Sequence, residues 1–312
     1  MRLLFLGAGA TGGYFGGRVV NAGADVTFLV RPKRREQLAR HGLKIEAPEG
    51  SFTMPVKAIT REEISSPFDA VIVSAKAYDL ASAIESIRPA VGDATVILPL
   101  LNGMKHLDAL DAAFGATRVL GGLCHISVTL ADDGTIRKLG DVATLTLGAR
   151  LPEQQAPAEK LHQVLARGTD AIYAENILAA IWEKWFFIAA LASSTCLMRA
   201  SVGEIVRTDG GPGFMAELLN ECIAIATANG YPPQPRALEF AQTFMTDPAS
   251  SITASMLRDI RKGGQIEADQ IVGDIIRRGS EKGVQAPLLR TAYVHLQAYQ
   301  NVLRVSQTSD RT

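Results

Sequence analysis

The sequence feature that most constrains the fold is a glycine-rich segment near the N-terminus, Gly7-Ala8-Gly9-Ala10-Thr11-Gly12. It follows a short apolar run and precedes a segment with helical character, which is the order of a strand, a tight turn and a helix. In such a turn the first glycine permits the bend, the second lets the backbone approach a pyrophosphate, and the third lets the helix pack on the strand. The alternative is a glycine-rich turn that binds nothing. The position after a strand favours a dinucleotide-binding turn, with residues 7 to 12 as cofactor contacts.

The first half of the chain alternates short apolar runs with segments that are long enough for crossover helices. The runs are Leu3–Leu6, Val26–Val30, Ala70–Ser74, Val96–Leu100 and Val119–Gly122. This alternation predicts a parallel, doubly wound sheet of the Rossmann type. Three later runs, at 126–130, 136–139 and 144–147, follow each other closely and predict a small antiparallel addition.

After about Glu175 the strand pattern stops and helical periodicity replaces it. The predicted helices cover residues 177–198, 213–229, 235–244, 255–261, 266–278 and 287–305. We therefore predict an α/β protein with a Rossmann-like, NADP-binding domain over residues 1–175 and an all-helical substrate and catalytic domain over residues 176–312. A chain of 312 residues can give each domain its own core.

Charge and cysteine content exclude several classes of function. The 32 basic residues equal the 32 acidic residues, so binding to nucleic acid or to an acidic membrane is not expected. The 3 cysteines form no CxxC pair and the 5 histidines have no metal-ligand spacing, so neither a disulfide framework nor a metal site is predicted. The apolar run at the N-terminus is too short for a signal peptide, and Trp185 to Met198 is too short for a membrane span. We expect a cytoplasmic protein.

The end of the second predicted strand indicates which nucleotide binds. An NAD enzyme usually has an acidic residue about 20 residues after the glycine fingerprint, where a carboxylate accepts a hydrogen bond from the ribose 2′-hydroxyl. This chain has Arg31 there, followed by Lys33, Arg34 and Arg35. Because a guanidinium suits a 2′-phosphate, Arg31 predicts NADP(H), while a solvated charge run accounts for part of the cluster.

Two polar residues follow predicted strands at the end of the sheet where ligands bind. Lys76 follows the third strand, and Asn102 with Gly103 follows the fourth. Lys76 would meet an oxygen of the cofactor or substrate, and Asn102 would donate or accept a hydrogen bond near the nicotinamide. The alternatives are an exposed loop lysine and an Asn-Gly turn, which the spacing alone fits equally well.

Lys184 is the candidate for acid catalysis, because it lies within the most apolar predicted helix of the chain. Burial lowers a lysine pKa toward the region of about 7 to 8 that suits a general acid at neutral pH. The alternative is a lysine that extends along the helix to reach solvent. Glu267 shares a predicted helical stripe with Ile271 and Ile275, so its carboxylate is expected to point inward toward a cation. A salt bridge without a catalytic role is the alternative.

Taken together, these features resemble the ketopantoate reductase family of NADPH-dependent 2-dehydropantoate 2-reductases. The shared features run over nearly the whole chain and comprise residues 7–12, Arg31, Lys76-Ala77, Asn102-Gly103-Met104, His125, Trp182-Glu183-Lys184, Ser255-Met256-Leu257 and Glu267.

The resemblance implies a two-domain enzyme whose active site lies in the cleft between the domains. It implies that Arg31 binds the 2′-phosphate, and that Lys76 and Asn102 line the nicotinamide and substrate site. It also implies that Lys184 is the general acid, and that Ser255 and Glu267 contact the substrate or orient the lysine. The partner is then a small 2-oxo acid, the pathway is pantothenate biosynthesis, and a homodimer is compatible with the sequence.

The chain departs from the family on the helix that carries Lys184. Family members resemble Lys-x-x-x-Asn-x-x-x-Asn there, whereas this chain has Lys184, Ile188 and Ala192. This difference does not change the expected reaction class, but it allows more than one substrate. The leading substrate is ketopantoate; the alternatives are a more apolar 2-oxo acid, or an NADP-sensing protein without turnover.

Overall fold

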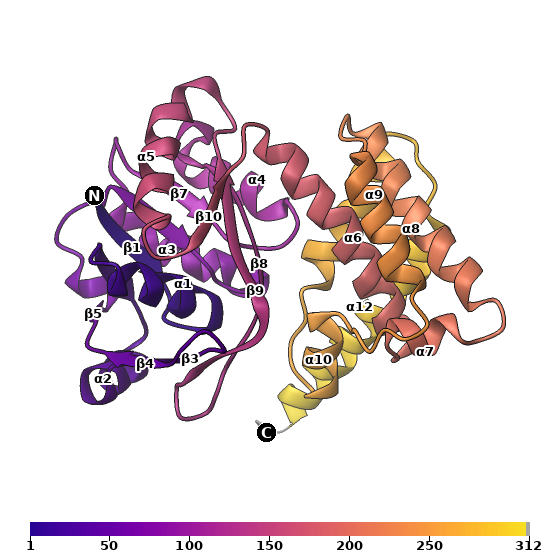
Figure 1. The fold of residues 1–312 in the computed structure, drawn as a ribbon, viewed down its shortest axis with the longest axis horizontal. Coiled ribbons are helices and arrows are strands. Elements are labelled where there is room, and N and C mark those ends of the chain that lie inside the picture. The colour runs from indigo at the N-terminus through magenta and orange to yellow at the C-terminus, as the bar shows by residue number, and fades with distance from the viewer. Residues whose placement is uncertain (310–312) are drawn as a thin grey trace. The chain divides into compact units, whose positions relative to one another are not determined.

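The computed structural model describes residues 1–309 of the chain. Those residues divide into two compact units. Unit 1 comprises Met1–Leu101 and His106–Leu178, and unit 2 comprises Asn102–Lys105 and the chain from Ala179 onward. Figure 1 shows unit 1 as mixed helices and strands and unit 2 as helices. The α/β class and the helical second half are thus confirmed. The short segment Asn102–Lys105 belongs to unit 2 although it lies deep within the N-terminal half of the sequence.

Unit 1 contains a parallel sheet with the strand order β5-β2-β1-β6-β7. Its strands are β1 (Arg2–Leu6), β2 (Asp25–Leu29), β5 (Lys57–Ile59), β6 (Ala70–Val73) and β7 (Val96–Pro99). The strands β6 and β7 are buried along their whole length, as expected for apolar strands covered on both faces. The order reverses at β1, which has β2 on one side and β6 on the other. This reversal is a topological switch point, where doubly wound sheets bind ligands.

In the sequence, strands β1, β2, β6 and β7 are followed by helices α1 (Ala10–Asn21), α2 (Pro32–His41), α3 (Leu80–Ile87) and α4 (Lys105–Phe114), respectively. Helix α1 buries Gly12, Gly13, Gly16 and Gly17, whose missing side chains let the helix approach its neighbours closely. A Cβ on Gly16 would lie 2.7 Å from the ring of Phe28 on β2. The glycine content of α1 is therefore a packing requirement as well as a binding signal.

A second sheet in unit 1 has the order β10-β9-β3-β4, with β8 paired to β9. It consists of β3 (Leu43–Glu46), β4 (Phe52–Met54), β8 (Gly121–Leu130), β9 (Ile136–Gly148) and β10 (Asp170–Tyr173), and α5 (Gln155–Leu165) precedes β10. The β8–β9 pair is antiparallel, which confirms the predicted addition.

The expectation that 119–122 forms a further strand of the parallel sheet is wrong. Val119 makes only an isolated bridge to Ile97, and Gly121 begins β8 of the second sheet. The apolar run is continuous with the hairpin strand that follows it. Apolar periodicity alone cannot assign such a run to one of two adjacent sheets.

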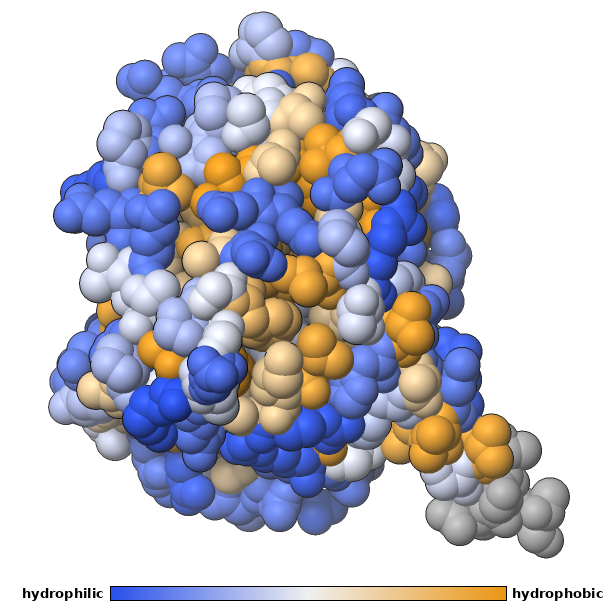
Figure 2. Space-filling view, turned by 90° about the vertical axis from the view of Figure 1, so that its right-hand side faces the viewer, coloured by the Kyte–Doolittle hydropathy of each residue, from blue (hydrophilic) through white to orange (hydrophobic). Residues whose placement is uncertain are grey.

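Unit 2 is built around α6 (Ile177–Met198), whose central side chains Trp185, Phe186 and Ala189 are buried. The other helices are α7 (Val202–Val206), α8 (Gly211–Ala228), α9 (Pro235–Thr246), α10 (Ser255–Arg261), α11 (Asp274–Glu281) and α12 (Pro287–Ser309). Residues Asp269–Gly273, at the start of the segment that continues into α11, form a π-helix. Figure 2 shows hydrophilic residues over much of the face that it presents, with smaller hydrophobic groups between them.

Among the described residues, α6 is the one helix whose length and composition would allow it to cross a membrane. In this protein it is a core helix, because Trp182, Trp185 and Phe186 are each at most 2% exposed. The aromatic side chains of Trp182 and Trp185 also contact each other, with ring centroids 4.8 Å apart. The apolar character of α6 is therefore accounted for by packing within unit 2.

Candidate active site

The glycine-rich turn lies between the end of β1 at Leu6 and the start of α1 at Ala10. Gly7 has a φ of 88°, which favours glycine, and its N–H donates to the carbonyl of Leu29 on β2. A Cβ on Gly12 would lie 2.2 Å from Ser74 Oγ and 2.7 Å from the carbonyl oxygen of Gly7. A Cβ on Gly9, in contrast, would meet nothing within 4 Å. Gly7 and Gly12 are thus required by the protein itself, whereas Gly9 leaves open space beside the turn.

A cavity of about 720 Å³ in unit 1 opens at this turn. Its lining includes residues 7–10, Gly12, Arg31, the segment Thr60–Glu62, Ser74 and Ala75. Helix α1 has no acidic residue in its first turn, and within the described chain no side chain caps it. Its first backbone N–H groups are therefore suited to an anion. The open space beside Gly9, the helix end and the size of the cavity fit a dinucleotide.

Arg31 caps α2 at the edge of this cavity, and its side chain is 82% exposed. Its guanidinium Nη2 lies 3.8 Å from Asp79 Oδ1, a loose surface pair. Arg34 also lines the cavity, but it donates to the carbonyl oxygens of Ala8 and Gly134, both at 3.1 Å. Burial lowers the pKa of this arginine. Arg34 therefore braces the glycine turn, while Arg31 is exposed to a ligand.

Arg35 has a different role, because it pairs with Glu63 at 2.6 Å on the protein surface. Thr60 and Arg61, which were not predicted from the sequence, line the cavity directly after β5. The sequence pattern that would have identified β5 was weak, since this strand has only 3 residues and no strong apolar pattern. Lys76 follows β6 and is exposed, next to Ala75 at the cavity wall.

The candidate catalytic residues of unit 2 are brought together by α6 and the segment that follows β7. Lys184 is half-buried, and its Nζ donates to Asn102 Oδ1 at 2.8 Å. An ammonium group only donates hydrogen bonds, so the amide oxygen of Asn102 must face it. The Nδ2 amide group of Asn102 then points away from the lysine, as a donor for another acceptor. The two residues are separated by 82 positions in the sequence.

Two further candidates occupy less distinctive positions. Ser255 is the first residue of α10 and is exposed. Glu267 is half-buried, and its backbone carbonyl accepts a hydrogen bond from Ile271 N at 3.0 Å. Glu267 and Ile271 keep the expected i, i+4 spacing through this bond, but the expectation of one regular α-helix is wrong, because Glu267 precedes the helix and the π-helix Asp269–Gly273 interrupts the stripe before Ile275 in α11. The wider π turn changes the phase of the residues on either side of it.

The side of α6 that carries Lys184 is apolar. Phe187 and Ile188, three and four residues further on, are half-buried, while Ala192 is only 2% exposed. Ile188 is therefore partly accessible one helical turn after Lys184, whereas Ala192 is packed inside unit 2. The hydroxyl of Thr195 cannot replace a missing amide there, since it donates within the helix to Leu191 O at 2.6 Å.

Comparison with known proteins places these features in a family. The family model "Ketopantoate reductase PanE/ApbA" matches residues 3–151, and "Ketopantoate reductase PanE/ApbA C terminal" matches residues 176–300. An uncharacterized oxidoreductase, YkpB of Bacillus subtilis, is 36% identical over 96% of this chain and 99% of its own length. The 2-dehydropantoate 2-reductase of Pyrococcus horikoshii is 28% identical over 92% of this chain and 94% of its own.

Among solved structures, 2-dehydropantoate 2-reductase from Geobacter metallireducens superposes with a TM-score of 0.87 at 28% identity. That match covers 96% of this chain and 99% of the other. Both units are thus matched by family models, and the fold of the whole chain is matched by a solved relative. The chain belongs to the ketopantoate reductase family, whose members are oxidoreductases acting on CH–OH groups.

Proposed function

We propose that this protein reduces a 2-oxo acid to the 2-hydroxy acid with NADPH, and that 2-dehydropantoate, which becomes pantoate, is its leading substrate. The observation that carries the proposal is the half-buried Lys184, whose ammonium group is held 2.8 Å from Asn102 Oδ1. A fixed lysine with further donors fits protonation of a carbonyl oxygen. Family membership supports the reaction class.

In the proposed mechanism the residues of unit 2 act on the carbonyl group of the substrate. Lys184 donates a proton to the carbonyl oxygen, and its positive charge stabilises the negative charge that develops there. Asn102 holds the lysine through Oδ1 and offers its Nδ2 group to an acceptor on the substrate or cofactor. When bound, the dihydronicotinamide supplies the hydride to the carbonyl carbon. The deprotonated lysine recovers its proton from solvent.

The proposed preference for NADPH depends on the end of β2. Arg31 lines the cavity and is 82% exposed, so its guanidinium can reorient toward a 2′-phosphate. Arg61 lines the same cavity and adds positive charge. Asp79 and Glu62 oppose it, because both carboxylates line the cavity too. The net preference therefore depends on Arg31 making direct, charge-assisted contacts.

A second candidate substrate is a more apolar 2-oxo acid, which the half-buried Ile188, one helical turn after Lys184, favours. Ketopantoate has a terminal hydroxyl that this side chain cannot bind. The experiment is NADPH oxidation by the purified protein with ketopantoate and with 2-oxo acids of equal size that lack the hydroxyl. A clear preference for ketopantoate supports the first candidate, and the reverse supports the second. Tight NADPH binding without turnover of any 2-oxo acid would point to a sensor.

We also propose a cytoplasmic location and, for the first candidate, a role in pantothenate biosynthesis. Burial of Cys124, Cys196 and Cys222 supports a reducing compartment, since none of these thiols is presented to an oxidant. The buried position of α6 supports the same location. Fractionation of the native protein tests the location, and loss of pantothenate-independent growth on gene deletion tests the pathway.

A further inference from the structure

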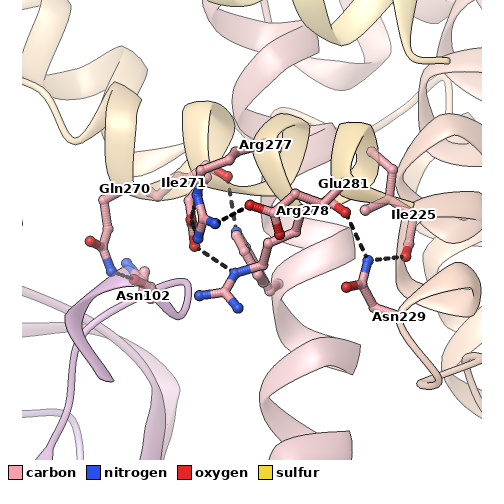
Figure 3. Close-up of polar contacts among 10 residues, drawn as sticks. Asn102, Ile225, Asn229, Gln270, Ile271, Arg277, Arg278 and Glu281 are labelled. Carbon is pink, nitrogen blue, oxygen red and sulfur yellow. Dashed lines mark hydrogen bonds and ion pairs between the residues drawn. The ribbon is translucent and has the colours of Figure 1, made fainter. Parts of the chain in front are cut away.

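Asn102 is held from two directions by residues of unit 2. Its side chain accepts a hydrogen bond from Lys184 Nζ at 2.8 Å, and its backbone carbonyl accepts one from Gln270 Nε2 at 2.7 Å. Gln270 is 168 positions away in the sequence and only 4% exposed. Figure 3 shows the Gln270 side chain reaching from its helix to the loop of Asn102. The backbone carbonyl of Asn102 only accepts hydrogen bonds, so the NH2 end of the Gln270 amide must face it. The contact is therefore specific for one orientation of this buried amide.

The residue after Asn102 fits tightly against the same glutamine. Gly103 has a φ of 75°, and a Cβ on it would lie 2.6 Å from the carbonyl oxygen of Gln270 and 3.4 Å from its Nε2. The loop therefore approaches the backbone of residue 270 as closely as a glycine allows. The main chain at residues 102 and 103 is thus fixed by both the side chain and the backbone of Gln270.

The π-helical segment that carries Gln270 is also joined to α6. Gln270 and Ile271 are adjacent in the π-helical segment, and Lys184 and Trp185 are adjacent in α6. Trp185 Nε1 donates to the carbonyl oxygen of Ile271 at 2.9 Å, which fixes α6 against the π-helix. Lys184 and Gln270 then meet at Asn102 from the two elements. The three hydrogen bonds, with the peptide links Lys184–Trp185 and Gln270–Ile271, close a ring that includes Asn102.

We propose that Gln270 is a positioning residue, which holds Asn102 by its backbone carbonyl so that the side chain of Asn102 orients Lys184 for proton transfer. The inference rests on the proposed function, because Lys184 is the general acid there. Gln270 donates to the backbone of the loop and acts through Asn102. A π-helix at this position agrees with the frequent occurrence of π-bulges at functional sites.

The test compares Gln270→Met with Gln300→Met in the full-length protein. Both changes keep an unbranched side chain and remove an amide that donates to a backbone carbonyl of unit 2; Gln300 Nε2 donates to Ile266 O at 3.3 Å. We expect Gln270→Met to speed hydrogen exchange in a peptide that covers Asn102–Lys105 and to lower kcat about 10-fold to 100-fold, since a misplacement of about 1 Å can cost 100-fold. The dissociation constant for NADPH should stay within about twofold. Gln300→Met should change neither the exchange of that peptide nor kcat.

A double variant separates positioning from general damage. If Gln270 acts through Asn102, adding Gln270→Met to Asn102→Ala should cause no further loss of kcat. Gly103→Ala, which crowds the same contact and leaves the Gln270 side chain intact, is the second route should Gln270→Met fold poorly. It should reproduce the faster exchange and the loss of kcat.

The possible results distinguish the positioning role of Gln270 from the proposed reductase function. Unchanged exchange of Asn102–Lys105 in Gln270→Met, or faster exchange with parental kcat, would overturn the positioning role. Additive losses in the double variant would overturn it as well. A parental enzyme that turns over no 2-oxo acid would overturn the proposed function instead, and the exchange measurement would still decide whether Gln270 fixes Asn102.

Discussion

The glycine-rich turn of unit 1 and the lysine site of unit 2 are built in opposite ways. The turn uses six consecutive residues and works through backbone: Gly7 takes the bend, Gly12 allows close packing, and Gly9 leaves space. In the lysine site, hydrogen bonds join Asn102 to two side chains from distant segments. Lys184 is 82 positions away in the sequence and Gln270 is 168 positions away. From this difference we expect that cofactor binding and turnover can be perturbed separately. Substitutions in unit 1 should act on cofactor affinity, and those in unit 2 on turnover.

The largest expected effect is that of Lys184→Ala. General acid catalysis by a positioned group contributes about 100-fold to 10,000-fold, and kcat should fall by a factor in that range. The dissociation constant for NADPH should be within about twofold of the parental value, because the lysine belongs to unit 2 and acts on the carbonyl group. Steady-state rates and fluorescence titration of NADPH measure the two quantities. Near-parental turnover would remove Lys184 from the mechanism.

Arg31→Ala should have the next largest effect, and it should fall on affinity. A charge-assisted hydrogen bond is worth about 1.5 to 3 kcal/mol, so NADPH binding should weaken about 10-fold to 100-fold. NADH binding should hardly change, since NADH has no 2′-phosphate. Arg35→Ala is the matched control, because that arginine pairs with Glu63 at the surface. Equal affinities for NADPH and NADH in the parental protein would show that Arg31 does not bind the 2′-phosphate.

Ile188→Asn should have a smaller effect, confined to the choice of substrate. Ile188 is half-buried beside Lys184, so an amide there can reach a substrate hydroxyl. One such hydrogen bond contributes about 0.5 to 1.5 kcal/mol, which raises kcat/KM for ketopantoate about twofold to tenfold. The comparison is with a 2-oxo acid without the hydroxyl, for which kcat/KM should not rise. A gain for both substrates alike would argue against a hydroxyl contact.

Ala192→Asn serves as the contrasting change on the same helix. Ala192 is 2% exposed, so an asparagine would bury an amide and overfill the core. We expect it to lower the melting temperature without improving turnover of ketopantoate. An increase in kcat/KM for ketopantoate would mean that residue 192 reaches the substrate after all.

The smallest expected effect concerns stability in unit 1, where the exposed Glu49 pairs with the buried Lys138 at 2.9 Å. Desolvation raises the pKa of Glu49, but hydrogen bonds from Tyr14 and Lys138 outweigh it and lower the pKa from 4.5 to about 2. A carboxyl with a depressed pKa stabilises the folded protein above its unfolded pKa, and this contribution is lost as pH falls from about 4.5 toward 2. The melting-temperature difference between the parental protein and Glu49→Gln should therefore shrink over that range. A difference that is constant with pH would contradict the assignment.

The contrast between the two regions also explains what the sequence could predict. The glycine turn, the alternation of strands and helices, and the change to helices near residue 175 are local patterns, and each of them appears in the structure. Strands β3, β4, β5 and β10 were missed because they are short and contain exposed or half-buried residues. Strands β6 and β7 are equally short, but all of their residues are buried, so their apolar runs could be identified.

The parts of the candidate site that were missed are those that depend on distant segments. Asn102 was identified from its place after a strand, but its membership of unit 2 and its contact with Gln270 have no local signal. The π-helix at Asp269–Gly273 also departs from the regular period assumed for Glu267 and Ile271. Long-range hydrogen bonds of this kind are visible only once the chain is folded.

We propose that unit 1 determines cofactor affinity and unit 2 determines turnover. The most direct test compares the NADPH dissociation constants of Gly9→Ala and Lys184→Ala. A Cβ on Gly9 meets no protein atom within 4 Å, so Gly9→Ala should fold with a parental melting temperature while filling the space proposed for the pyrophosphate. We predict that Gly9→Ala weakens NADPH binding at least about tenfold, and that Lys184→Ala leaves it unchanged. Parental affinity in Gly9→Ala, or weakened affinity in Lys184→Ala, would contradict the account.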